Sequence, residues 1–185
     1  ERAAALWEQA IEADPAQYMA YRNLAAAYYS HLGRPEKALP LLEKALALHP
    51  GDGQLVWEKG YLMTRLHAAP LDTAAFLAAS GIMREDVTLE RCRALNLAGQ
   101  HAQVLELMAS RQFVPCEGGE HAVAEQYMFA HHALGRRAIQ AGDLQTALTH
   151  FLAAQHLPEN LGAGLWNEVL LVPHQYFEAI CRQRL

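Results

Sequence analysis

Cysteine is scarce and scattered in this chain of 185 residues. The three cysteines, Cys92, Cys116 and Cys181, are odd in number and far apart, and no CxxC pair occurs. A zinc ribbon needs closely spaced cysteines and a disulfide framework an even set, so both classes are disfavoured. We therefore expect reduced thiols that pack as small apolar side chains in a cytoplasmic protein.

Long apolar runs and basic runs are also lacking. No apolar stretch approaches the roughly 18–20 residues of a membrane span, so no membrane partner is expected. The net charge is −5, with both signs mixed along the chain and no interleaving of basic and aromatic residues. Nucleic-acid binding is disfavoured, because it needs a basic patch or stripe.

Recognisable catalytic motifs are missing too. The chain has no G-x-S-x-G, no P-loop and no H-E-x-x-H motif, and its carboxylates show no spacing typical of acid–base pairs. We predict no catalytic residue, no cofactor and no enzymatic activity in this chain.

Apolar residues are plentiful, at 52% of the chain, and they are arranged with helical periodicity. The chain starts and stops inside such patterns, at Glu1-Arg2 and at Arg184-Leu185. We therefore expect a piece of a longer protein.

An internal repeat organises the pattern. A set of six residues recurs 35 positions later: Ala3, Leu6, Trp7, Glu8, Ala10 and Pro15 correspond to Ala38, Leu41, Leu42, Glu43, Ala45 and Pro50. A second set recurs after 109 positions: Gly33, Ala38, Leu42 and Ala45 correspond to Gly142, Ala147, Phe151 and Ala154. The shared spacing of small, large and small residues at i, i+4 and i+7 lies on one face of a helix. The small residues allow a second helix to approach closely.

These motifs resemble the tetratricopeptide repeat (TPR), whose pattern is aromatic-x2-L-G/A-x2-Y, then A-x3-F-x2-A, then P. The first match is Tyr21, Leu24, Ala25, Tyr28, Ala38, Leu42, Ala45 and Pro50, and the second is Leu134, Gly135, Gly142, Ala147, Phe151, Ala154 and Pro158. The resemblance implies an all-α, TPR-like α-solenoid, a right-handed superhelix of antiparallel helix pairs. Its middle is degenerate, because 71–80 lacks the second-helix signature and Val104 replaces an alanine.

We predict helices at 2–13, 17–31, 35–48, 53–67, 71–79, 85–97, 101–110, 120–141, 144–156 and 174–185. The units of one repeat domain, 1–185, are about 1–17, 18–52, 53–84, 85–119, 120–161 and 162–185. The first and last are partial, and the third and fourth degenerate.

A narrower resemblance covers residues 113–165. Phe113-x-Pro115-x-Glu117-Gly118-Gly119-Glu120 and Pro158-x-Asn160-Leu161-Gly162-x-Gly164 are similar to the C-terminal TPR region of large bacterial proteins of uncharacterised function. Those proteins carry an N-terminal β-rich domain like sugar-binding or mutarotase-like folds. The resemblance implies a carbohydrate-related context without catalytic residues in this chain.

The TPR resemblance also implies a binding groove on the concave face, lined by first helices. The family's groove positions fall on Met19, Arg22, Ala26, Tyr29, Gln54, Trp57, Tyr61, Thr64, Asp86, Leu89, Arg93, Asn96, Phe129, His132, Arg136 and Ile139. Aromatic residues and arginines supply much of the binding energy of interfaces, and arginine binds carboxylates through two parallel hydrogen bonds. We take Arg22, Tyr29, Trp57, Tyr61, Arg93, Phe129, His132 and Arg136 as the candidate site for an acidic or C-terminal peptide. Packed aromatics and solvated arginines are the alternative interpretation.

A metal site is disfavoured. Cys116, Glu117, Glu120, His121 and Glu125 contain possible ligands, but Gly-Gly before a helix is usually backbone geometry and an acid at a helix start complements the helix dipole. The adjacent His131 and His132 point about 100° apart on a helix, so they do not form one chelate.

Three functions stay open from the sequence. The leading one is an interaction scaffold for a protein, a peptide or another domain of the same chain. The alternative is a non-catalytic module of a carbohydrate-active or sugar-binding multidomain protein. The third is homodimerisation through the apolar segment 166–177.

Overall fold

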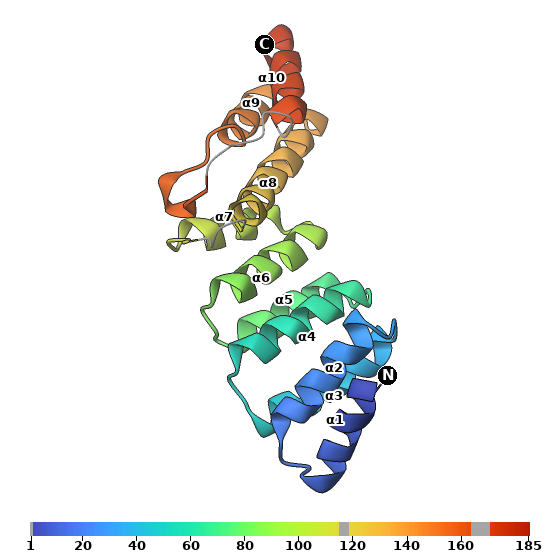
Figure 1. The fold of residues 1–185 in the computed structure, drawn as a ribbon. Helices are drawn as coiled ribbons and strands as arrows, with labels where there is room; N and C mark the ends of the chain where they lie inside the picture. The colour runs from blue at the N-terminus through green and yellow to red at the C-terminus, as the bar shows by residue number, and fades with distance from the viewer. Residues whose placement is uncertain (1, 115–118, 164–170) are drawn as a thin grey trace. The chain divides into compact units, whose positions relative to one another are not determined.

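The fold consists of successive α-helices, and short turns join those from α1 to α7 and join α8 to α9 (Figure 1). A computed structural model describes residues 2–114, 119–163 and 171–185. The helices are α1 (Arg2–Ala13), α2 (Tyr18–Ser30), α3 (Pro35–Leu48), α4 (Gly53–Arg65), α5 (Pro70–Ala79), α6 (Glu85–Leu97), α7 (His101–Ala109), α8 (Glu120–Gln140), α9 (Leu144–Ala153) and α10 (Val172–Arg184), with a short 3₁₀ helix, η1, at Glu159–Leu161. No strand occurs within the described ranges, so the predicted all-α class is confirmed.

Local sequence signals explain where the helices begin and end. The Asp52 carboxylate caps α4 by accepting hydrogen bonds from the backbone N–H groups of Gln54 and Leu55, and Asp143 caps α9 in the same way. Gly142 has φ +80° and ends α8, and the N–H of Asp143 after it bonds to the Ala138 carbonyl at 2.9 Å. These signals are local, and the predicted boundaries agree with the structure to within three residues.

The first repeat has the core that its spacing predicts. Ala25 on α2 and Ala38, Leu42 and Ala45 on α3 are all fully buried, and Tyr21 is 8% exposed. They form one cluster with Leu55 and Leu62 of α4, so the second helix of one repeat also contacts the first helix of the next. This arrangement buries the apolar faces that a single helix pair would expose.

Gly135 and Phe151 form the corresponding contact between α8 and α9. A Cβ atom on Gly135 would lie 2.7 Å from the ring of Phe151, so only glycine fits without displacing the ring. Phe151, Ala147 and Ala154 are fully buried, as the second match to the motif predicts.

The degenerate middle has the same contact with different residues. A Cβ on Gly60 of α4 would lie 2.6 Å from Cδ2 of Leu77 on α5. Thr73, Leu77 and Ser80 occupy the i, i+4 and i+7 positions, and the first two are 1% and 2% exposed. The segment 71–80 lacks the A-x3-F-x2-A residues, as expected, but the same spacing packs against α4. Threonine and serine replace the alanines as small residues, and leucine replaces the aromatic.

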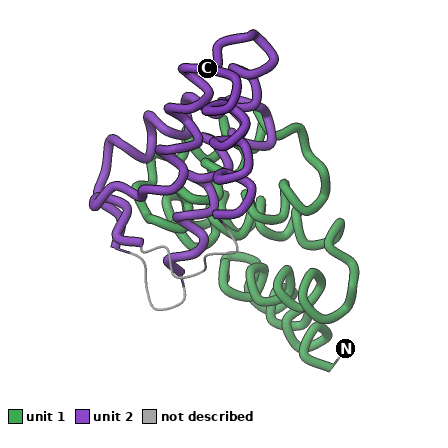
Figure 2. The backbone as a smooth tube through the Cα atoms, turned by 90° about the horizontal axis from the view of Figure 1, so that it is seen from above, with its two compact units in different colours: residues 1–94 green, residues 95–185 purple. Residues whose placement is uncertain are grey.

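The chain divides into two compact units, residues 1–94 and residues 95–185, coloured green and purple in Figure 2. Within unit 1, α1 packs against α2, α2 against α3, α3 against α4, and α4 against α5. Within unit 2, α8 packs against α7 and α9, and α9 against α10. In the described part of the chain, no helix has the length and apolar character needed to cross a membrane.

The contact between Gly135 and Phe151 predicts the cost of a larger residue. Gly135→Ala should destabilise the chain by about 1–3 kcal/mol, because its methyl group collides with a ring that has no free space. Urea denaturation of Gly135→Ala, of Phe151→Leu and of the double variant measures the energetic coupling between the two residues. The double variant should be more stable than the sum of the single effects predicts, and strict additivity would contradict the contact.

Candidate functional site

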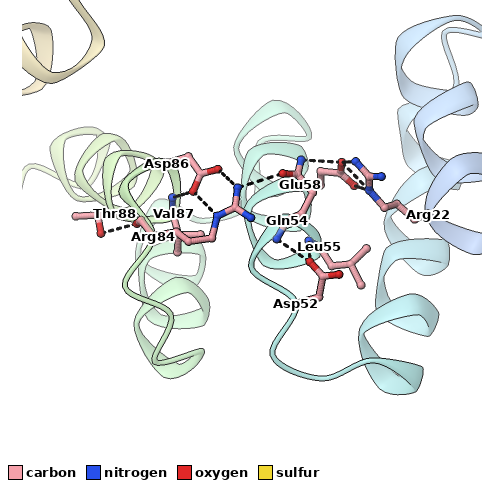
Figure 3. Close-up of polar contacts among 9 residues, drawn as sticks. All are labelled: Arg22, Asp52, Gln54, Leu55, Glu58, Arg84, Asp86, Val87 and Thr88. Carbon is pink, nitrogen blue, oxygen red and sulfur yellow. Dashed lines mark hydrogen bonds and ion pairs between the residues drawn. The ribbon is translucent and has the colours of Figure 1, made fainter. Parts of the chain in front are cut away.

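A chain of polar contacts connects the first helices of unit 1 (Figure 3). On α2, the Arg22 guanidinium donates from Nε to both oxygens of Glu58 at 3.0 and 3.1 Å and from Nη2 to Oε1 at 2.6 Å. The Glu58 side chain on α4 is only 3% exposed, while that of Arg22 is 28% exposed. The hydrogen bond to Glu58 raises the pKa of Arg22, so the guanidinium stays charged beside this buried side chain.

The polar chain continues from α4 to α6. Gln54 donates from Nε2 to Glu58 at 3.0 Å and accepts from Arg84 Nη2 at 3.2 Å. Arg84 also forms an ion pair with Asp86 at 2.6 Å. Figure 3 shows these side chains in one continuous row across α2, α4 and the start of α6.

A second buried carboxylate, Glu90 on α6, repeats this arrangement. Its side chain is 1% exposed and pairs with Arg93 Nη1 at 2.8 Å. The Thr64 hydroxyl of α4 donates to its other oxygen at 2.7 Å. The two predicted site arginines of unit 1, Arg22 and Arg93, are thus both bound to carboxylates of their own chain. The buried glutamates had no signal in the repeat pattern.

An aromatic pocket lies beside the polar chain. Its volume is about 460 Å³, and it is lined by Tyr29, Ser30, Pro35, Tyr61, Leu62 and Arg65. Trp57 stacks on Tyr61 with ring centroids 5.5 Å apart, and the Arg65 guanidinium lies over the Tyr61 ring, 4.9 Å from its centroid. Partial burial raises the pKa of Tyr29, so its hydroxyl remains a hydrogen-bond donor at neutral pH. The structure therefore brings Tyr29, Trp57 and Tyr61 together.

Arg65 is the residue of this pocket that the sequence did not single out. It is exposed, and it makes no ion pair within the described ranges. Its position one turn after Tyr61 on α4 was the available signal, since residues at i and i+4 share a helix face.

The remaining candidates belong to unit 2. Phe129 is 51% exposed and lines an apolar pocket of about 240 Å³ with Glu125, Met128, His132, Pro173 and His174. Arg136 is exposed on the same helix, α8. The His132 ring makes T-shaped contacts with the rings of Phe151 and Phe177, with centroids 5.6 and 5.3 Å apart, so this side chain packs against other side chains of unit 2.

Asn96, one of the wider set of predicted groove positions, is a structural residue. It is 5% exposed, donates to the backbone and side chain of Gln126 at 3.1 Å, and pairs with Nδ1 of His101 at 3.0 Å. Burial lowers the pKa of His101, so a neutral ring donates its Nδ1–H to the Asn96 oxygen. This network connects α6, α7 and α8 within unit 2.

The disfavoured metal site falls partly outside the described residues, which include neither Cys116 nor Glu117. His121 and Glu125 lie one turn apart on α8, and both are exposed. The described ranges contain no group of three histidine, cysteine, aspartate or glutamate side chains placed to hold a metal ion. His131 pairs with His150 on α9 and His132 with His174 on α10, so the two adjacent histidines have different partners.

The motif pair that carries the narrower resemblance has a structural role in unit 2. Asn160 of η1 donates from Nδ2 to the carbonyls of Met108 and Arg111 at 3.0 and 2.9 Å, and its own carbonyl accepts from the Phe113 N–H at 2.8 Å. Phe113 and Leu161 are 1% and 0% exposed. The described parts of the two segments therefore contact each other through Phe113 and Asn160.

Comparison with known proteins agrees with this geometry. Residues 20–62, which cover most of α2, all of α3 and most of α4, match the sequence model described as tetratricopeptide repeat. The fold is that of a TPR protein. The structure of YrrB, described as "a TPR protein with an unusual peptide-binding site", superposes with a TM-score of 0.61 and 19% identity, over 100% of this chain and 84% of YrrB. The structure of PilW, described as a "widely conserved type IV pilus biogenesis factor", gives a TM-score of 0.50 and 20% identity, over 98% of this chain and 82% of PilW.

The buried Arg22–Glu58 pair predicts a large cost for losing one partner. Arg22→Ala should destabilise unit 1 by about 2–3 kcal/mol, because it leaves the Glu58 carboxylate buried and unpaired. The matched control is Arg182→Ala on α10, whose side chain is 58% exposed in its pair with Glu178 and should cost less than about 1 kcal/mol. Thermal denaturation of both variants compares them. Equal losses of stability in the two variants would show that the buried Glu58 carboxylate does not need Arg22 as a partner.

Proposed function

We propose that this chain is a protein-interaction scaffold, and that unit 1 binds an extended peptide, or a segment of an adjacent domain, on the face of α2 and α4. The observation that carries the proposal is the open pocket of about 460 Å³ between Tyr29 and Tyr61. The candidate residues divide into two roles: Tyr29, Trp57 and Tyr61 contact the ligand, while Arg22 and Arg93 hold the surface in place.

Aromatic rings suit this role because they offer large contact areas with little loss of conformational freedom. Trp57 and Tyr61 are stacked and partly buried, so their conformation is already fixed before a ligand binds. A surface ordered in advance loses less entropy on binding, which raises affinity. The pocket between the two tyrosines accepts one side chain of the ligand.

The charge of the pocket favours an acidic ligand segment. Arg65 is the charged side chain among the six lining residues, and it lies over the Tyr61 ring. The Tyr29 and Tyr61 hydroxyls and Ser30 add hydrogen-bond donors to the same lining. A carboxylate next to an apolar side chain complements this combination, as the sequence-based hypothesis of an acidic or C-terminal peptide requires.

Unit 2 offers a second, smaller candidate surface. Phe129 and Arg136 are exposed on α8, and Phe129 borders the apolar pocket next to α10. We propose it as a further contact for the same kind of partner.

Homodimerisation through 166–177 is a separate proposal, and part of that segment lies outside the described residues. Light scattering of the purified chain decides whether dimers form.

Selection from a random peptide library displayed on phage tests the proposed function. The 185-residue chain should enrich peptides with an acidic residue beside an aromatic or aliphatic one. Tyr61→Ala should weaken binding of an enriched peptide about tenfold or more, because it removes a central anchor. Arg65→Gln should weaken it less and reduce its dependence on salt.

Tyr176→Ala provides the matched control. Tyr176 is 62% exposed on α10 in unit 2, so removing it leaves the proposed pocket intact. If the enriched peptides bind the wild type, Tyr61→Ala and Tyr176→Ala with equal affinity, the Tyr29–Tyr61 pocket is not the binding site. Failure to enrich any peptide would contradict peptide binding itself.

A further inference from the structure

Two histidine pairs connect α8 to the last two helices of unit 2. Nδ1 of His131 lies 2.9 Å from Nδ1 of His150 on α9. Nδ1 of the next residue, His132, lies 3.3 Å from Nδ1 of His174 on α10. The pairs therefore join three helices, through histidines that are 19 and 42 residues apart in sequence.

The pair between α8 and α10 is embedded in an aromatic cluster. Phe177 of α10 stacks on Phe151 of α9 with ring centroids 5.2 Å apart, and His132 meets the edges of both rings. His174 is 5% exposed, and Cys181, one turn beyond Phe177, is fully buried. This cluster forms part of the contact between α10 and the rest of unit 2.

The geometry of each pair excludes two charged rings. A hydrogen bond between two ring nitrogens needs one donor and one acceptor, so each pair holds at most one extra proton. Two imidazolium rings at these distances repel, and burial strengthens the repulsion because it reduces screening. Burial, together with the neighbouring histidines, lowers the pKa of His131 and of His174 to about 4. Burial also lowers the pKa of His132 and of His150.

The other charged groups around the cluster do not compensate four protons. On α8, Glu125 lines the pocket beside His132 and His174, whereas Arg136 further lowers the pKa of His132. On α10, the Glu178 carboxylate is already bound by Gln155 of α9 at 2.7 Å and by Arg182 at 2.8 Å. Tyr127 of α8, which packs against the edge of His131, is neutral because burial raises its pKa.

We propose that the four histidines form a proton-sensitive latch, which holds α10 against α8 and α9 at neutral pH and releases it in mild acid. Released histidines titrate near 6.5, while the packed rings resist protonation until a lower pH. Packing of α10 is therefore fully stabilised above about pH 6.5 and is weakened progressively as the pH falls toward 4. Release would uncover the apolar surface of Phe151, Phe177 and Cys181.

Hydrogen–deuterium exchange read by mass spectrometry tests this latch at pH 7.5 and pH 5.0, after correction for the intrinsic exchange rate. Protection of residues 172–185 should fall about tenfold or more at pH 5.0 relative to that of α3, because each packed histidine with a pKa near 4 must remain unprotonated. Equal protection of α10 at the two pH values would overturn the proposal.

The double variant His132→Gln/His174→Gln separates a latch from general acid sensitivity. Glutamine can donate and accept hydrogen bonds but does not titrate, so the fall in protection between the two pH values should shrink about tenfold. The control His31→Gln, at an exposed position of unit 1, should behave like the wild type. An undiminished fall in the double variant would contradict the latch. If α10 of that variant is already unprotected at pH 7.5, the double variant His131→Gln/His150→Gln is tested instead. An undiminished fall in protection in this second variant would contradict the latch.

Discussion

The structure depends on the contact between a large side chain of one helix and a glycine or alanine of the helix before it. Phe151 against Gly135 and Leu77 against Gly60 are the two clearest examples, and in both a single added methyl group would collide. Close approach of the backbones is what allows a pair of short helices to bury its apolar faces. The large side chain of this contact comes from the second helix of each pair. Part of the surface of the first helix therefore remains available for polar and aromatic residues.

A second constraint shapes that surface. Glu58 and Glu90 are charged groups buried on α4 and α6, and each requires a cation because burying an unpaired carboxylate is costly. Arg22 and Arg93 fill this need and are therefore engaged within the chain. The surface proposed for ligand binding in unit 1 therefore consists of Tyr29, Trp57 and Tyr61, with Arg65 as the exposed cation of the pocket. In unit 2, the partly buried polar contacts include two histidine pairs, and the charge of these pairs depends on pH.

Most of the fold could be predicted because its information is local. The i, i+4, i+7 spacing of Ala38, Leu42 and Ala45 requires only helical geometry, and caps such as Asp143 act within one turn. The middle repeat was underestimated because Thr73 and Ser80 fill the role of alanine through their size, which a letter pattern does not register. The site was predicted less well. Arg22 and Glu58 are 36 residues apart, and His132 and His174 are 42 apart, so no pattern within one helix reveals their pairing.

The most direct test of the account is a map of ligand binding on the isotopically labelled chain, by amide chemical-shift perturbation with a peptide selected by the wild type. In this account the second helices face the core and the first helices form the binding surface. The largest chemical-shift changes are therefore expected at Tyr29, Trp57, Tyr61 and Arg65. The buried residues Ala38, Leu42 and Leu77 should show only small changes. Shifts concentrated on α3 and α5, with none on α2 and α4, would contradict it.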